Sequence, residues 1–493
     1  MKHLFTLLLS FFTLSLFAQE TPEPGHGLPI GLSGHEPSSI ADYKAGLQSS
    51  RAITTIPDFT PRTMAEWEEI QSLCITWAGY EGILKQIVRY AKNECEVIIL
   101  CDDQASVVNY LNNTLFGGPL PDLNNITFLV TPFNSVWMRD YGMETMYQND
   151  VDSLFLMDWI YNRPRPDDDA CPEVIADTKG IPIYRSLQAP NDLVHTGGNF
   201  MADGFGTAFS SNLVIDENGS SGNFNLTVHT PSQVDSLLKW WMGINTYVRM
   251  ATLPNDAIHH IDMHMKLIDE ERLLVGEFPV GVSDGPQLET NLNTTVAGFN
   301  STFGSPYKLV RIPMPPSTSG LYAPDASYRT YANNVFVNKT VLVPTYREEY
   351  DSTGLRILRE SLPGYNVVPI DCDNSGMNII SASGAIHCIT KGIGVSDPLL
   401  IKHQALQDTY DDSDPYTVAA WIRHKSGIAD ATLYWSTDTA AGFNAVAMLP
   451  AGGDNYTADI PAQVIGSRHL YYVHAVANSG KQQVRPITAP AGW

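Results

Sequence analysis

The sequence predicts an α/β body followed by a smaller all-β domain. Between about residues 64 and 400, short apolar runs rich in β-branched residues alternate with segments of helical spacing. This alternation is typical of α/β domains. After residue 400 the helical spacing ends, and short strands separated by turn residues follow. The chain has 493 residues, 43% of them hydrophobic, which is enough for several domains with a sizeable core.

The body shows the same order of elements several times. A strand-like run is followed by a helical segment and then by another strand-like run, a cadence that allows an internal repeat. We expect strands at residues 72–77, 97–100, 126–130, 266–268, 273–275, 335–337, 340–343 and 385–389, and helices at residues 83–93, 104–112, 232–242 and 353–362.

The C-terminal residues 403–493 are predicted to form an immunoglobulin-like β-sandwich. Turn signals such as Ala451–Asp454 and Asn478–Gly480 separate its short alternating runs. This part contains no cluster of catalytic residue types, so we interpret it as a packing or interaction module. Strands are expected at residues 416–422, 431–435, 445–449, 456–460, 470–477 and 483–487.

The N-terminus indicates export. Residues 1–18 combine an early lysine, the apolar run Leu4–Phe17 and a final alanine, as a secretory signal peptide does. The run is too short to span a bilayer, and no other stretch reaches that length, so we expect no membrane insertion. Residues 19–55 are rich in Pro, Gly and Ser and are predicted to be a flexible lead-in. We therefore expect a secreted or periplasmic protein.

Charge and cysteine content exclude two classes of protein. The net charge of -23 argues against a nucleic-acid partner, because phosphates require Lys and Arg. The six cysteines contain no CxxC pair, which makes a structural zinc site improbable, and they are too few for a disulfide scaffold in so long a chain.

A single cysteine near the end of the body is the first candidate for chemistry. Cys388 lies in the strand-like stretch Ser383–Gly392, with small residues before it and a glycine after it. Glycines allow a ligand to approach the backbone closely. A lone free cysteine is more often a small buried hydrophobe, so its interpretation depends on the other motifs.

Two further motifs supply carboxylates and an imidazole. Asp140 lies in the segment 137–142 beside Trp137, where it could present a carboxylate next to an aromatic wall or form a structural ion pair with Arg139. His260 and Asp262 are two residues apart, so in an extended segment they project from the same face. The histidines at 259, 260 and 264 also permit a metal site, although no acidic residue stands at a familiar ligand spacing.

The third motif is a pair of arginines around a proline. Arg163 and Arg165 are held apart by Pro164 and could clamp a carboxylate. Alternatively, they form a solvated charge run with the acidic residues 167–169 that follow. The turns around Asn333 and at 195–199 are ordinary polar loops when considered alone.

Taken together, these motifs resemble a known family. The chain is similar to the guanidine-modifying penteins and, within them, to the bacterial peptidylarginine deiminases, which are relatives of the agmatine deiminases. The resemblance extends from about Thr55 to Leu400 through six motifs in the expected order. These are WMRDYG (137–142), RPR (163–165), HTGGN (195–199), HHID (259–262), NNVFVNKTVLVP (333–344) and GAIHCIT (384–390).

The resemblance implies a fold and a set of roles. Residues 56–402 would form a five-bladed pseudosymmetric α/β propeller, the catalytic domain, with the active site at its centre. It also implies peptide or protein substrates bearing arginine, and chemistry that needs neither a metal nor an organic cofactor. By this resemblance Cys388 is the nucleophile, His260 is the general acid and base, and Asn333 is a supporting catalytic residue. Asp262 and Asp140 are the carboxylates that bind the guanidinium, and Trp137 is a wall of the pocket. Arg163 and Arg165 are the pair that binds the α-carboxylate of a C-terminal arginine.

Departures from the family pattern bear on the substrate. Agmatine deiminases carry an acidic residue just before the Gly-Gly pair, where this chain has Thr196, and this difference favours peptidyl arginine over agmatine. Agmatine and free arginine stay open as substrates. A Cys-His protease is a second alternative, although papain-type proteases place the cysteine before the histidine. A non-catalytic binding protein is the third.

Overall fold

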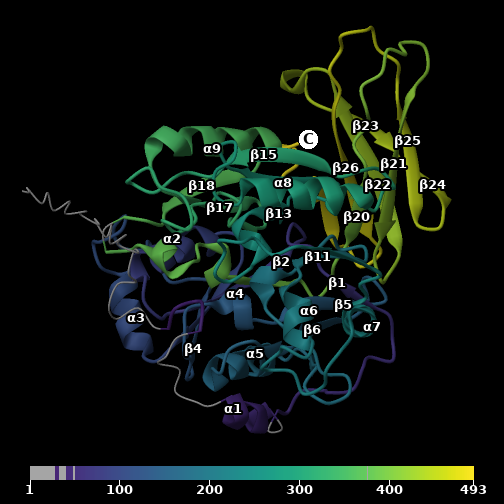
Figure 1. Ribbon diagram of the computed structural model, residues 1–493. Coiled ribbons are helices and arrows are strands. Elements are labelled where there is room, and N and C mark those ends of the chain that lie inside the picture. Colours follow the sequence, from purple (N-terminus) through teal and green to yellow (C-terminus); the bar gives the residue numbers. More distant parts are fainter. Residues whose placement is uncertain (1–27, 33–39, 48–49, 375) are drawn as a thin grey trace, which may run out of the picture.

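The computed structural model of the chain describes residues 28–32, 40–47, 50–374 and 376–493. The predicted signal peptide, residues 1–18, lies outside the described residues. In the described part of the chain, five sheets of three or four strands and a short two-stranded sheet, β7 (Ile160–Tyr161) with β9 (Val194–His195), make up the body, and two four-stranded sheets form a separate lobe at the C-terminal end (Figure 1). No helix of the described part is both long enough and apolar enough to cross a membrane.

The first sheet joins the two ends of the body. Strand β2 (Ile70–Thr76) lies parallel to β3 (Glu96–Cys101), which lies parallel to β4 (Ile126–Val130). Helix α2 (Glu81–Ala91) connects β2 to β3, and α3 (Gln104–Leu111) connects β3 to β4. On its other side, β2 pairs antiparallel with β19 (Lys391–Gly394), from the far end of the body. The sheet therefore contains strands from the beginning and the end of this part of the chain.

The other four sheets share one pattern, in which an antiparallel pair is followed by a helical crossover to a parallel strand. The sequence pattern allowed such a repeat, and the strand pairing contains it. One of these sheets contains β1 (Pro61–Thr63), β5 (Glu144–Gln148), β6 (Leu154–Asp158) and β8 (Ile183–Arg185), and its crossover helix is α5 (Pro166–Lys179). The next contains β10 (Met201–Ala202), β11 (Thr207–Ser211) and β12 (Thr246–Met250), and its crossover contains α6 (Leu213–Asn218) and α7 (Pro231–Met242). The next two are β13 (Met265–Leu267), β14 (Arg272–Glu277) and β15 (Lys308–Pro313) with α8 (Gly285–Thr294), and β16 (Val335–Val337), β17 (Thr340–Thr345) and β18 (Asn366–Asp371) with α9 (Glu348–Ser361).

Apolar spacing explains why these elements form. In α2, Ile83, Leu84, Ile87, Val88 and Ala91 are all buried, and they recur at the three- and four-residue intervals that give a helix one apolar face. Strands β6, β11 and β17 are buried along their whole length, which is typical of sheets covered on both faces. The predicted strands and helices of the body are confirmed within a few residues at each end, with one exception described below.

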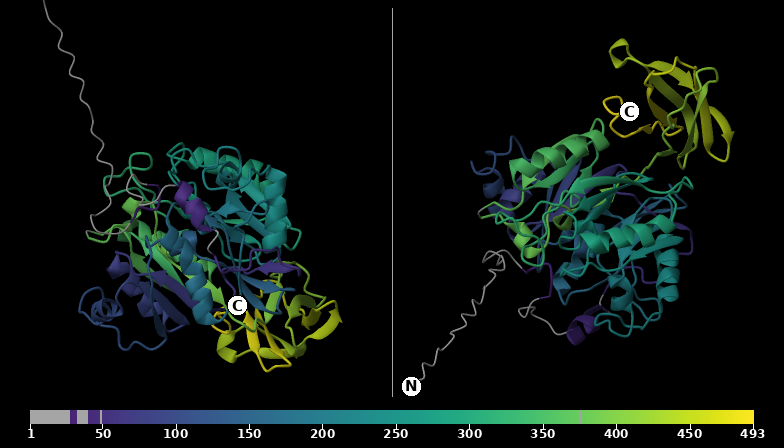
Figure 2. Two further views of the ribbon diagram at one scale, coloured as in Figure 1. Left: turned by 90° about the horizontal axis from the view of Figure 1, so that it is seen from below. Right: turned by 45° about the horizontal axis from the view of Figure 1, so that its top comes forward.

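The C-terminal lobe consists of two antiparallel sheets, seen beside the body in Figure 2. One sheet has the order β20-β21-β25-β24 and the other β23-β22-β26-β27, and their inner faces enclose a hydrophobic core of their own. Ion pairs connect the lobe to the body, including Lys481 with Glu69 at 2.6 Å and Arg485 with Glu270. The strands are β20 (Leu400–His403), β21 (Tyr416–Arg423), β22 (Ile428–Ser436), β23 (Asn444–Ala447), β24 (Leu449–Gly452), β25 (Asn455–Ile460), β26 (Leu470–Ala477) and β27 (Gln482–Arg485).

The strand predicted at residues 385–389 is wrong. His387–Ile389 form a single 3-10 turn, η6, and the strand begins only at Lys391. The backbone turns because Ser383 adopts a left-handed conformation, with φ 68°, and because Gly384 packs so closely on Trp137 that a Cβ atom would lie 2.4 Å from its ring. The thiol therefore lies on a turn that precedes a strand.

The lead-in contains more structure than its composition suggests. Helix α1 (Ile40–Gly46) buries Tyr43, whose hydroxyl donates a hydrogen bond to the carbonyl oxygen of Tyr161 at 3.0 Å. Residues 28–32 pack against the body, and Ile30 is buried. At least these parts of the predicted flexible lead-in are held by contacts with the body.

Candidate active site

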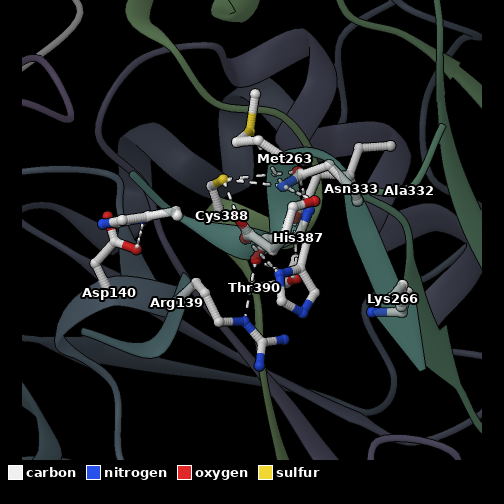
Figure 3. A network of polar contacts seen from close by, with 12 residues as sticks. Arg139, Asp140, Met263, Lys266, Ala332, Asn333, His387, Cys388 and Thr390 are labelled. Atoms are coloured by element: carbon white, nitrogen blue, oxygen red, sulfur yellow. Dashed lines mark hydrogen bonds and ion pairs between the residues drawn. The ribbon is translucent and has the colours of Figure 1, made fainter. Parts of the chain in front are cut away.

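The predicted catalytic side chains come from separate units of the body and meet in its interior. Cys388 lies on η6, Asp262 on the 3-10 turn η3 (Ile261–Met263), and Asp140 on the one-turn helix α4 (Met138–Tyr141). His260 immediately precedes η3, and Asn333 precedes β16. All five side chains are at least 98% buried. Figure 3 shows Cys388, Asn333 and Asp140 around the centre of this cluster.

The thiol of Cys388 lies between an amide and a carboxylate. The Nδ2 atom of Asn333 is 3.2 Å from Sγ, and Sγ is 3.5 Å from Oδ2 of Asp262. The backbone N–H of His387 donates to Oδ1 of Asn333 at 3.0 Å, which directs the amide N–H group toward the sulfur. The Asn333 amide N–H group can therefore stabilise a negative charge that develops on the sulfur.

His260 and Asp140 form the opposite side of the cluster. Nδ1 of His260 is 3.5 Å from Oδ1 of Asp140. Both ring nitrogens of His260, Oδ1 of Asp140 and Oδ1 of Asp262 are buried and make no hydrogen bond to any described residue. Gly198 packs between these groups, and a Cβ atom there would lie 2.4 Å from Nδ1 of His260 and 2.9 Å from Asp140. Buried polar groups of native proteins normally have partners, so this set of atoms indicates a site for a polar ligand.

His387, beside the thiol, is clamped between two carboxylates. Its Nδ1 atom is 2.7 Å from Oδ2 of Asp262, and its Nε2 atom is 2.6 Å from Oε1 of Glu66. Both ring nitrogens of His387 thus face carboxylate oxygens. Arg139, at 2.8 Å, and Lys266 also pair with Glu66, so Glu66 connects these two cations to His387 and, through its ring, to Asp262.

Burial and charge set the protonation states of this cluster. Burial, together with Asp262, raises the pKa of Asp140 to about 8, and burial lowers the pKa of His260 to about 3. Burial also raises the pKa of the Cys388 thiol well above its usual range, with Asp262 and Asp140 adding to the rise. Burial opposes the ionisation of Asp262, but the hydrogen bond from His387 outweighs it and lowers the pKa of Asp262. At neutral pH the site therefore holds one carboxylate, a protonated Asp140, a neutral imidazole and a thiol.

We expect Asp140→Asn to stabilise the protein, and increasingly so as the pH rises. The wild-type carboxyl keeps its proton up to a pKa of about 8 in the folded chain, but loses it at about pH 4 when unfolded. Between these values the unfolded state binds fewer protons, so wild-type stability falls with rising pH. The isosteric amide does not titrate, so the free energy of unfolding should exceed that of wild type by about 5 kcal/mol at pH 8.

Denaturant unfolding at pH 4, 6 and 8 tests this expectation. The difference between variant and wild type should shrink toward pH 4. The matched control is Asp102→Asn, which makes the same change at an exposed position and should give a difference near zero at every pH. A constant difference between Asp140→Asn and wild type would contradict the raised pKa.

The predicted substrate-binding residues line one side of the same cluster. Trp137 is fully buried, and its ring packs against Gly384, whose Cβ position is also 3.2 Å from Cβ of Cys388. Arg165 is completely buried, and Arg163 is 8% exposed. The solvated charge run considered for these arginines is therefore wrong. Of the aspartates that follow, Asp169 pairs with Arg185 at 2.8 Å.

Two details of the sequence-based site differ in the structure. His260 and Asp262 do not lie in one extended segment as predicted. His260 has an extended backbone, whereas Asp262 lies on the 3-10 turn, and this turn brings both side chains to the site. Among the described residues, His259, His260 and His264 do not join other ligand-type side chains in a group that could hold a metal ion. The remaining predicted residues, Cys388, Asp140 and Asn333, lie together as expected.

Sequence reasoning missed the charge chain behind the nucleophile. His387 lies in the motif 384–390, and its position next to the cysteine is the one signal in the sequence that points to it. Glu66 is 321 residues away from His387 in the sequence and belongs to no recognised motif. Only folding brings the two together.

The fold of the body is shared with known proteins of solved structure. The crystal structure of the "Putative Arginine Deiminase from Porphyromonas gingivalis" superimposes with a TM-score of 0.58 at 20% identity, covering 67% of this chain and 98% of the other. That of the C. jejuni agmatine deiminase with substrate bound has a TM-score of 0.56 at 18% identity, covering 69% and 98%. A protein of Vibrio parahaemolyticus named "Putative agmatine deiminase" is 24% identical over an alignment of 305 residues that covers 55% of this chain and 78% of that protein.

Fold and family define the class of this protein as a pentein-type deiminase, an enzyme that hydrolyses a C–N bond of arginine-type guanidinium groups. A family model matches residues 62–393. The chain belongs to the Porphyromonas-type peptidyl-arginine deiminase family.

Proposed function

We propose that this enzyme converts the C-terminal arginine of peptides to citrulline and releases ammonia, with Cys388 as the nucleophile. The observation that carries the proposal is the convergence of a thiol, an imidazole and two carboxylates in one buried cluster, with Sγ of Cys388 3.5 Å from Asp262 and His260 3.5 Å from Asp140. The five repeated sheets of the body support a five-bladed α/β propeller around this cluster.

The carboxylates are suited to hold a planar cation. Each of Asp140 and Asp262 has a buried Oδ1 atom that makes no hydrogen bond to a described residue, and a guanidinium can donate to both. A bound cation favours the ionised forms of both carboxyl groups, so Asp140 gives up its proton when the substrate arrives. The same positive charge lowers the cost of a thiolate at Cys388. Substrate binding thus prepares the nucleophile.

The reaction then proceeds in two balanced halves. Neutral His260 takes the proton of the thiol, and the Cys388 thiolate forms a C–S bond with the central guanidinium carbon. The imidazolium returns the proton to the departing nitrogen, the C–N bond breaks, and ammonia leaves a thiouronium on the enzyme. His260 next takes a proton from water, the hydroxide adds to the same carbon, and the C–S bond breaks as the added hydroxyl group loses its proton, which gives the neutral ureido group. The departing thiolate takes one of these two protons, and the other returns to the Asp140 carboxylate, so that His260 is neutral again. The proton that Asp140 released on substrate binding leaves with the ammonia as ammonium.

Asn333 and His387 would position the reacting groups. The Asn333 amide at 3.2 Å donates to the sulfur and stabilises its negative charge. His387 holds Oδ2 of Asp262 at 2.7 Å, which keeps that carboxylate ionised and leaves Oδ1 to the substrate. Hydrogen bonds from neighbours of this kind fix the direction of a catalytic side chain. His387 itself touches no reacting atom in this scheme.

The arginine pair and Thr196 support a peptide substrate. Arg163 and Arg165 are buried and lie close enough to Asp140 for their charges to oppose the rise in the pKa of its carboxyl group. Guanidinium groups bind carboxylates with paired hydrogen bonds. Thr196 is fully buried and cannot supply the negative charge that would attract the amino group of agmatine. Agmatine is the second candidate substrate, because relatives and solved structures carry that name.

A panel of substrates tests the function. We expect citrulline formation with a kcat/KM at least about tenfold higher for peptides ending in arginine than for internal arginine, free arginine or agmatine. Colorimetric detection of ureido groups, together with ammonia release, measures all four. Agmatine as the best substrate would favour the second candidate. Peptide cleavage without citrulline would instead indicate the Cys-His protease.

The organisation around the catalytic body is also proposed. A signal peptide at residues 1–18 would direct export, so that the enzyme acts on extracellular or periplasmic peptides and proteins. Residues 56–402 would form the catalytic domain, and residues 403–493 an immunoglobulin-like domain. Because strand β20 (Leu400–His403) pairs with β21, the lobe begins a few residues before the predicted boundary. The two facing antiparallel sheets of the lobe support the latter proposal.

A further inference from the structure

A short segment of the lead-in crosses the proposed substrate-binding side chains. Residues 28–31 run past Trp137, Arg163 and Arg165, and each of their four carbonyl oxygens accepts a hydrogen bond from one of these three side chains. Trp137 Nε1 donates to Leu28 at 2.8 Å, Arg163 Nε to Ile30 at 3.2 Å, and Arg165 Nη2 to Pro29 at 2.5 Å and to Gly31 at 3.0 Å.

The segment is also held by one apolar side chain. Ile30 is 1% exposed and belongs to the hydrophobic cluster that contains Trp137 and Cys388. Leu32, two residues on, is 56% exposed. One buried apolar side chain and four main-chain carbonyl groups therefore hold the segment. A bound peptide ligand is held in the same two ways, by main-chain hydrogen bonds and by side chains in pockets.

We propose that residues 28–32 are an internal occupant of the peptide-binding site, a strap that must move away before a substrate can bind. The same two guanidiniums that would hold the α-carboxylate of a substrate are engaged by neutral carbonyl groups of the strap. A carboxylate forms stronger, charge-assisted hydrogen bonds with a guanidinium than a carbonyl does. A C-terminal peptide can therefore displace the strap at the atoms where the two compete.

The burial of the site is the second observation in favour of the strap. Cys388 and His260 are 0% exposed, although a substrate has to reach both. A tethered segment competes at a high effective concentration. When a site is open for only a fraction of the time, its apparent affinity for a ligand is reduced in proportion to that fraction. Displacing the strap should thus increase both access to the thiol and the apparent affinity for substrate.

The inference rests on the proposed function in one respect, the assignment of Arg163 and Arg165 to the substrate carboxylate. The accessibility of Cys388 does not depend on that assignment. Alkylation of this thiol by iodoacetamide, a small neutral reagent unlike arginine, is therefore measured beside citrulline formation.

The experiment compares full-length Ile30→Asp with wild type and with the matched control Leu32→Asp. A charge at residue 30 cannot stay in the apolar cluster, whereas the same change at the exposed residue 32 leaves the strap in place. We expect Ile30→Asp to accelerate the alkylation of Cys388, quantified by mass spectrometry of its peptide, by about tenfold or more, and to raise kcat/KM for a peptide ending in arginine by a similar factor. Leu32→Asp should match wild type in both.

Two further measurements keep the test decisive. Ile30→Gly removes the anchor without a buried charge and should behave like Ile30→Asp, even if the latter lowers the melting temperature. An acetylated pentapeptide with the sequence of residues 28–32, added to Ile30→Asp, should slow the alkylation again. Unchanged alkylation in both Ile30 variants would overturn the strap. Faster alkylation without any citrulline formation would support the strap and reject the proposed function.

Discussion

Cys388→Ala is expected to abolish citrulline formation while the fold stays intact. The proposed reaction passes through a bond between Sγ and the guanidinium carbon, and no other thiol lies within hydrogen-bonding distance of Asp262 and Asn333 among the described residues. Loss of a nucleophile costs about 10⁴-fold or more in kcat. The change removes one buried sulfur atom, so circular dichroism and the melting temperature should remain close to those of wild type.

The matched control is Cys372→Ala, which removes another fully buried thiol at the end of β18. All six cysteines are free, so neither substitution breaks a disulfide. Cys372→Ala should retain wild-type kcat, because its Sγ donates to the carbonyl oxygen of Ile370 at 3.4 Å and to no catalytic side chain among the described residues. If Cys388→Ala still released ammonia from arginine peptides, Cys388 would have no place in the mechanism.

The second large effect is expected from the double change of Arg163 and Arg165 to Ala. For peptides ending in arginine, KM should rise by about 100-fold, because two hydrogen bonds to a charged carboxylate are worth about 3 kcal/mol. Peptides with internal arginine, or with an amidated C-terminal arginine, lack that carboxylate and should be affected far less. Steady-state kinetics on these three substrates checks the prediction.

The same variant distinguishes the substrate anchor from the strap. It removes three of the hydrogen bonds that hold residues 29–31, so alkylation of Cys388 should become faster while KM for C-terminal arginine becomes worse. Arg51→Ala serves as the control, because its guanidinium is mostly exposed and pairs with Asp177 on the surface. Equal KM effects on all three peptide substrates would leave Arg163 and Arg165 with a structural role only.

Most of the body could be predicted because its signals are local. The apolar face of α2 is encoded by residues three and four apart, and the bounds of β16 (Val335–Val337) follow from a short β-branched and aromatic run. The turn at Cys388 could not be predicted in this way. Residues 385–389 are apolar like a strand, and they turn because Gly384 lies against Trp137, a residue from a distant part of the chain.

The same limit applies to the site. Cys388, His260, Asp262 and Asp140 could be selected from separate motifs, because thiols, imidazoles and carboxylates at such positions suit one kind of chemistry. Glu66 could not, since its role exists only through contacts with His387, Arg139 and Lys266. Likewise, the composition of the lead-in gives no sign that four of its carbonyl groups are bound by buried side chains.

The pairing of β19 with β2 has a consequence for when this enzyme becomes active. The nucleophile stands a few residues before the strand that closes the body, and the contact of His387 with Glu66 spans 321 positions of sequence. Contacts between such distant residues form late, after the intervening segments have folded. A chain that is still being synthesised therefore lacks the contacts that assemble the cluster around Cys388, and these contacts form only when the whole body has been made.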